Sequence, residues 1–168
     1  MDPIDTIADP PIILGASLAT AAVQLARRDV EGAVRFAVAA PLACGIAKLL
    51  KYAVDEHRPR LVGKQLEQSF PSGHSAAISA YAVSIVLATR RWWTLPLAAA
   101  AIGVVNVSRV WRREHWAKDV IAGDVIGLVG AAVAAGAVYA LHHHRAKTVT
   151  PTRSEPMVGA TTGSPSRF

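Results

Sequence analysis

Three short stretches of the chain carry residue types that are suited to phosphate chemistry. Positive charge stabilises the equatorial oxygens of a phosphoryl group in transfer, and a histidine can act as nucleophile or as general acid. The three stretches supply both kinds of group, so they predict phosphoryl transfer through a histidine. The residues concerned are Lys51, Arg58, Ser72, Gly73, His74, Arg109, His115 and Asp119.

The nucleophile is expected in the third stretch, where Asp119 follows His115 by four residues. On a helix this spacing places both side chains on one face. A carboxylate on one imidazole nitrogen fixes the tautomer, leaves the other nitrogen free to attack, and stabilises the cation that forms. Taken alone, such a pair is more often an ordinary surface pair, so its weight depends on the other two stretches.

Three cations are expected to bind the phosphate. Arg58 and Arg109 offer planar forks that match phosphate oxygens, whereas Lys51 offers a point charge. The alternative for each of them is an interfacial anchor beside a membrane helix.

The second stretch, residues 71–74, reads Pro-Ser-Gly-His and is expected to begin a helix. Ser72 is suited to cap that helix, and backbone N–H groups at a helix start bind anions. Gly73 allows the backbone to approach a phosphate closely. His74 could then protonate the leaving group. A purely structural cap followed by an interfacial histidine is the alternative.

These stretches lie between apolar segments. We expect helices over residues 11–26, 32–50, 75–89, 92–107 and 120–141. Several are shorter than the roughly 20 residues of a full span, but they are rich in Ala and Gly, and Gly123 with Gly127 forms a small-xxx-small pair. The predicted fold is therefore all-α, an integral-membrane helical bundle of about five transmembrane helices. A soluble bundle of buried helices is the alternative.

Composition agrees with a membrane protein. Apolar residues make up 52% of the chain and the mean hydropathy is +0.30. The net charge of +6 comes from cations between the apolar segments, without interleaved aromatic residues, so nucleic acid is not an expected partner. The single Cys44 excludes an intrachain disulfide. The acidic N-terminus makes a cleaved signal peptide unexpected.

The chain is expected to divide into three parts. Residues 1–11 form a short N-terminal tail, residues 12–141 the membrane domain, and residues 142–168 a basic, disordered tail. If every apolar segment crosses the membrane, all three polar stretches meet on one side. The other side carries Arg27, Arg28, Arg90 and Arg91, which favours it as cytoplasmic. The site would then face the periplasm or the outside from the inner (plasma) membrane.

The polar stretches resemble the signature motifs of a known superfamily. Lys-x6-Arg-Pro from Lys51, Pro-Ser-Gly-His at 71–74 and Ser-Arg-x5-His-x3-Asp at 108–119 are similar, in order and spacing, to the three motifs of the type 2 phosphatidic acid phosphatase superfamily. That superfamily includes lipid phosphate phosphatases, soluble bacterial acid phosphatases and vanadium haloperoxidases. The similarity extends over about residues 12–141, although many membrane members have six spans.

The resemblance implies an integral-membrane lipid phosphate phosphatase. His115 would become a phosphohistidine, Asp119 would orient it, and His74 would be the general acid. Neither a metal nor another cofactor is implied. The residues matching phosphate-binding positions are Lys51, Arg58, Ser72, Gly73 and Arg109.

The substrate stays open at this point. A polyprenyl pyrophosphate, a polyprenyl-phosphosugar phosphate, phosphatidic acid and phosphatidylglycerol phosphate all fit, and the sequence does not address the oligomeric state. The alternatives in other classes are a vanadate-dependent haloperoxidase-like enzyme and a non-catalytic membrane lipid-binding protein.

Other polar residues are expected to have supporting roles. Asp124 lies roughly 140° around the helix from Asp119, which favours a structural pair over a catalytic role. Arg112 and Arg113 either hold a second phosphate or remain solvated. The run of three histidines at 142–144 is predicted to be an interfacial basic cluster and not a metal site.

Overall fold

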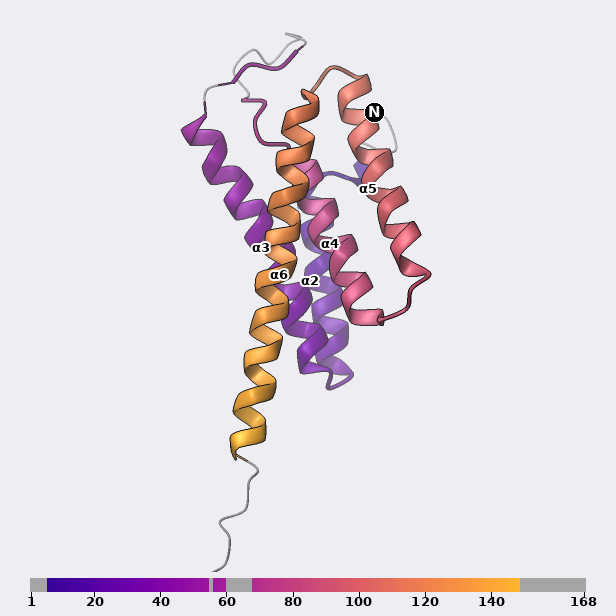
Figure 1. Ribbon diagram of the computed structural model, residues 1–168, viewed down its shortest axis with the longest axis vertical. Helices are drawn as coiled ribbons and strands as arrows, with labels where there is room; N and C mark the ends of the chain where they lie inside the picture. The colour runs from indigo at the N-terminus through magenta and orange to yellow at the C-terminus, as the bar shows by residue number, and fades with distance from the viewer. Residues whose placement is uncertain (1–5, 55, 60–67, 149–168) are drawn as a thin grey trace, which may run out of the picture.

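The protein is a bundle of α-helices (Figure 1). The computed structural model describes residues 6–54, 56–59 and 68–148, and it contains no strand within those ranges. This confirms the predicted all-α class and the positions of the five apolar helices. In chain order they are α2 (Pro10–Ala26), α3 (Val30–Ala53), α4 (Gly73–Thr89), α5 (Thr94–Trp111) and α6 (Ala117–Thr148).

Three of these helices are long and apolar enough to cross a membrane, judged by length and composition. They are Val30–Ala53, Thr94–Trp111 and the part of α6 over Ala117–His144, while α2 and α4 are shorter apolar helices. Many large apolar side chains face outward, for example Leu97 at 61% and Val107 at 65% exposure on α5. Such a surface is typical of a protein that contacts lipid. The chain is accordingly a helical membrane protein.

The helices extend somewhat beyond the predicted segments, except that α5 begins at Thr94, two residues after its predicted start. α2 begins at Pro10, where the fixed φ of proline suits a first helical residue. α6 continues to Thr148, past the expected end of the last span and into the predicted tail. Residues 1–5 and 149–168 of the two predicted tails lie outside the described residues.

Small residues set the distance between α6 and its neighbours. A Cβ on Gly123 would lie 2.5 Å from the carbonyl oxygen of Ser72, and one on Gly127 would lie 2.6 Å from Cβ of Ser79. The predicted small-xxx-small pair therefore packs directly against α4. A buried cluster made almost entirely of alanines continues this packing between α3, α4 and α6. Its members are Ala39, Ala40, Ala43, Ala47, Ala76, Ala80, Ile126, Ala131 and Ala134.

α5 lies at the edge of the bundle (Figure 1), and a partly buried carboxylate ties it to the other helices. Asp124 of α6 accepts hydrogen bonds from Ser79 of α4 and from Asn106 of α5, both at 2.6 Å. Polar groups inside a membrane bundle need such partners. The contacts agree with the structural role expected for Asp124.

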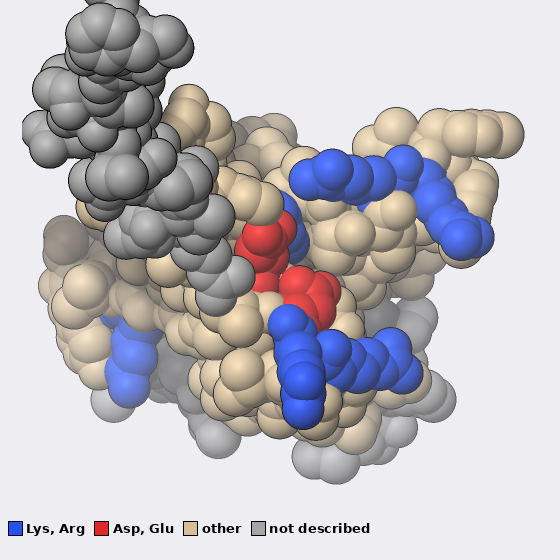
Figure 2. Space-filling model, turned by 90° about the horizontal axis from the view of Figure 1, so that it is seen from below, with Lys and Arg blue, Asp and Glu red and all other residues tan. Residues whose placement is uncertain are grey.

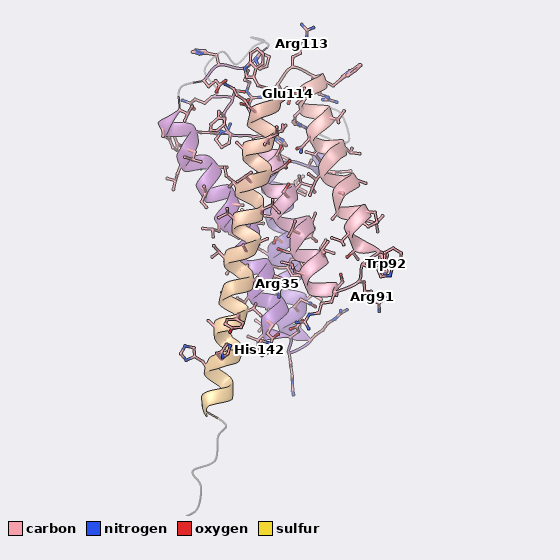
Figure 3. All side chains as sticks on the ribbon, viewed as in Figure 1. Arg35, Arg91, Trp92, Arg113, Glu114 and His142 are labelled. Carbon is pink, nitrogen blue, oxygen red and sulfur yellow. The ribbon has the colours of Figure 1, made fainter. Side chains whose placement is uncertain are left out.

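The connections after α3 and α5 lie at the same end of the bundle, as the alternation of spans predicts. Figure 3 shows Arg113 and Glu114 at this end, and Arg91, Trp92 and His142 toward the other. Figure 2 looks onto that other end, where Lys and Arg side chains surround a smaller acidic patch. One contact at that end joins His142 Nε2 to Glu31 Oε1 at 2.7 Å. The three polar stretches are thus brought together by the order of the helices alone.

Candidate active site

A cavity of about 330 Å³ opens where the polar stretches meet. Five of the eight predicted site residues line it, and the other three are buried. The lining comprises Asp9, Pro10, Lys51, Arg58, Gln68, Gly73, His74 and His115. The buried three are Ser72 and Asp119, at 0% exposure, and Arg109 at 2%.

His115 and Asp119 are in contact, although they do not share a helix as the spacing had suggested. α6 begins at Ala117, so His115 lies in the preceding loop. The loop is turned by Arg113, which has a positive φ of 56°, and the N–H of His115 donates to the carbonyl of Arg109. This turn brings His115 Nδ1 to 3.4 Å from Asp119 Oδ2.

The Asp119 carboxylate is held by two further donors. The backbone N–H of Trp116 donates to Oδ2 at 3.0 Å, and the Ser69 hydroxyl donates to the same oxygen. Ser69 Oγ also lies 3.4 Å from His115 Nδ1. Because the carboxylate and hydroxyl both face Nδ1, Nε2 is the imidazole nitrogen left for chemistry in the cavity.

The start of α4 is fixed to the start of α6. Ser72 is the N-cap of α4, as expected, and its hydroxyl accepts from the N–H of Ser75 at 3.3 Å. Its own N–H donates to the carbonyl of Asp119 at 3.0 Å. The second and third stretches are therefore joined through their backbones, and this junction lies beside the close contact at Gly123.

Arg58 follows the end of α3, outside the helix, as the proline after it requires. Neighbouring residues dock this segment onto the loop that carries His115. Trp116 Nε1 donates to the carbonyl of His57 at 3.2 Å, and Lys118 Nζ lies 2.6 Å from Glu56 Oε1. These contacts explain why Arg58 reaches the same cavity as His115.

The other two cations have partners that the motifs do not contain. Lys51 Nζ donates to the carbonyl of Gln68 at 2.8 Å. Arg109 Nη1 lies 2.8 Å from Glu114 Oε2, and the guanidinium is almost fully buried. A buried arginine needs a fixed acceptor, so Glu114 both orients it and compensates its charge.

The surroundings of His115 favour its neutral form. Burial lowers the pKa of His115 to about 4, with Arg58 and Lys51 adding to this effect and Asp119 opposing it. A neutral imidazole at physiological pH has a lone pair available, as a nucleophile requires.

Sequence reasoning missed four residues of the site: Asp9, Gln68, Ser69 and Glu114. Three of them reach it through contacts between segments far apart in the chain, which no local pattern reports. Glu114 could have been found, because it directly precedes His115 and lies five residues after Arg109. Arg112 and Arg113, for which a second-phosphate role and a solvated position were both open, line a separate hollow with Pro59 and Trp111.

No metal site is evident in the part of the chain that the structure describes, where no three His, Cys, Asp or Glu side chains converge. Within the predicted basic cluster, the rings of His143 and Tyr139 are in contact, with their centroids 4.2 Å apart.

Fold and site together define a helical membrane protein with a buried His–Asp pair inside a cationic cavity. The chain belongs to the PAP2 superfamily, whose family model matches residues 32–145. It is also similar to an undecaprenyl-diphosphatase of Sulfolobus acidocaldarius, with 30% identity over 117 residues. That match covers 64% of this chain and 56% of the relative, so the chain spans little more than half of that protein. No solved structure matches the chain.

Proposed function

We propose that the protein is an integral-membrane phosphatase that hydrolyses a phosphomonoester or diphosphate of a lipid through a phosphohistidine at His115. The observation that carries the proposal is the cavity geometry. His115 is paired with Asp119 through Nδ1 and shares the cavity with Lys51, Arg58 and His74. Membership of the PAP2 superfamily supports the same reaction class.

The first step would transfer the phosphoryl group to the protein. His115 Nε2 attacks phosphorus in line while the bond from phosphorus to the leaving oxygen breaks. Lys51, Arg58 and the buried Arg109 stabilise the charge on the equatorial oxygens. His74 gives its proton to the leaving oxygen, and Asp119 stabilises the positive imidazole of the phosphohistidine.

In the second step water attacks the phosphohistidine. Neutral His74 takes a proton from that water, and the bond from phosphorus to His115 breaks. Inorganic phosphate leaves, His74 is protonated again, and no net proton has been gained or lost by the site.

The chemistry of the relative's printed name makes a polyprenyl diphosphate the first substrate to test. The apolar surface of the helices would keep the lipid chain within the bilayer. We place the cavity on the outer, periplasmic side of the inner membrane, because the opposite end carries Arg27, Arg28, Arg90 and Arg91.

The test is phosphate release by protein purified in detergent, with EDTA present, from a panel of polyprenyl diphosphates and glycerophospholipid phosphates. We expect release from at least one lipid and none from His115→Ala. Activity that survives His115→Ala would show that the nucleophile is another group. A cysteine placed at residue 64 and labelled in intact cells would test the orientation, since labelling only after lysis contradicts it.

A further inference from the structure

The catalytic cavity contains an acidic group that none of the three motifs supplies. Asp9 is the single carboxylate among the described residues that line this cavity, where Lys51, Arg58 and two histidines also lie. A carboxylate repels a phosphate, so its presence in an anion site needs a reason.

The side chain of Asp9 does not cap helix α2. It occupies the N-cap position of α2, yet its side chain makes no capping hydrogen bond. The backbone carbonyl of Asp9 does accept from the N–H groups of Ile12 and Ile13, at 2.9 and 3.0 Å. The carboxylate is therefore available to face the cavity.

Among the described residues, the ion pair that this carboxylate forms is with His74. Its Nε2 lies 3.9 Å from Asp9 Oδ1, with the imidazole 22% and the carboxylate 49% exposed. This separation is longer than a direct hydrogen bond but within the range of an ion pair.

Burial lowers the pKa of His74 to about 3, with four charged or titratable groups adding to this effect. These groups are Lys51 of α3, Arg58 of the following segment, Arg109 of α5 and His115 of the loop before α6. Asp119 is turned toward His115 and the N–H of Trp116. Asp9 is thus the group placed to favour the proton that a general acid must carry.

We propose that Asp9 is a positioning residue that favours the protonated form of His74 once a phosphate is bound and directs its Nε2 at the leaving oxygen. The inference rests on the function proposed above. The charge of a bound phosphate offsets that of the surrounding cations, so that Asp9 can stabilise the imidazolium, and the proton passes to the leaving oxygen as its bond to phosphorus breaks. Water attack then returns a proton to His74, so Asp9 stays ionised and exchanges no proton itself.

The test compares Asp9→Asn, Asp9→Glu and a matched control, Glu31→Gln, which removes a carboxylate at the other end of the bundle. Asparagine caps a helix as well as aspartate does, so α2 should be retained. For Asp9→Asn we expect kcat to fall about three- to tenfold with KM little changed. The alkaline limb of kcat, which reports the substrate complex, should move to lower pH by about half a unit to one unit. Asp9→Glu should recover part of the activity, and Glu31→Gln should behave as the unmodified protein.

A second readout uses the leaving group. p-Nitrophenyl phosphate releases a phenolate that needs little protonation, so Asp9→Asn should affect its hydrolysis much less than that of a lipid phosphate. A loss of equal size for both substrates, or an unmoved alkaline limb, would overturn the proposal. If His115→Ala kept its activity, the proposed function itself would fail. If His115→Ala is inactive while Asp9→Asn matches the unmodified protein, only the role of Asp9 fails.

Discussion

Replacing Gly123 by alanine should test whether the close packing of α6 against α4 is required for activity. The added Cβ would lie 2.5 Å from the carbonyl oxygen of Ser72 and 2.8 Å from Cβ of Ser75, whereas real Cβ contacts essentially never fall below 3.0 Å. One neighbour is backbone and cannot rotate away, so the two helices must separate by at least about 0.5 Å.

This separation acts directly on the site. The backbone bond from Ser72 N–H to the Asp119 carbonyl crosses the same junction at 3.0 Å, and Asp119 in turn contacts His115. Overpacking of this kind costs about 1–3 kcal/mol of stability. A displacement approaching 1 Å between reacting groups lowers the rate by about a hundredfold. We therefore expect a folded protein with kcat/KM reduced by about one to two orders of magnitude.

The matched control is Gly136→Ala in the same helix, where a Cβ would meet nothing within 4 Å. Alanine favours the helix by up to about 1 kcal/mol relative to glycine, so the control should be active and no less stable. The assay is phosphate release in detergent, together with thermal unfolding of each variant. The reasoning is refuted if Gly123→Ala keeps activity and melting temperature within error of Gly136→Ala.

Three further results are expected. Burial, Arg58 and Lys51 lower the pKa of His115 to about 4, so the acid limb of kcat/KM should lie well below pH 6.5. Arg58→Gln should move this limb to higher pH, and a move to lower pH would contradict the electrostatic account. Asp124→Ala removes two hydrogen bonds between helices, so the free energy of unfolding in detergent should fall by about 1–3 kcal/mol. Asp124→Asn should lose less, and equal losses would show that these hydrogen bonds do not stabilise the bundle. Vanadate resembles the pentacoordinate transition state and should inhibit competitively, so insensitivity at millimolar concentration would count against attack by His115.

Much of the architecture could be predicted because its signals are local. Long Ala- and Leu-rich segments predict apolar helices, and their alternation across a membrane places residues 51, 74 and 109 at one end without any knowledge of packing. The cap at Ser72 and the close packing at Gly123 and Gly127 were also readable, since each depends on a short pattern.

Which side of each helix contacts its neighbours could be predicted much less well. The spans are apolar on all sides, so periodicity does not say which side of α5 meets α6. The polar link from Asn106 to Asp124 decides it, and this contact joins two separate helices.

The sequence by itself determined the helices, the end of the bundle where chemistry occurs, and the residue types available there. Only the tertiary structure decided how those residues are held. Ser69 contacts Asp119 across 50 positions of sequence, and Asp9, just before α2, lies beside His74 of α4. The physical reason is that a hydrogen bond or an ion pair forms only when its two groups lie within about 3–4 Å of each other. Which groups come that close depends on loop turns such as the one at Arg113 and on the separation of packed helices, neither of which a spacing of motifs encodes.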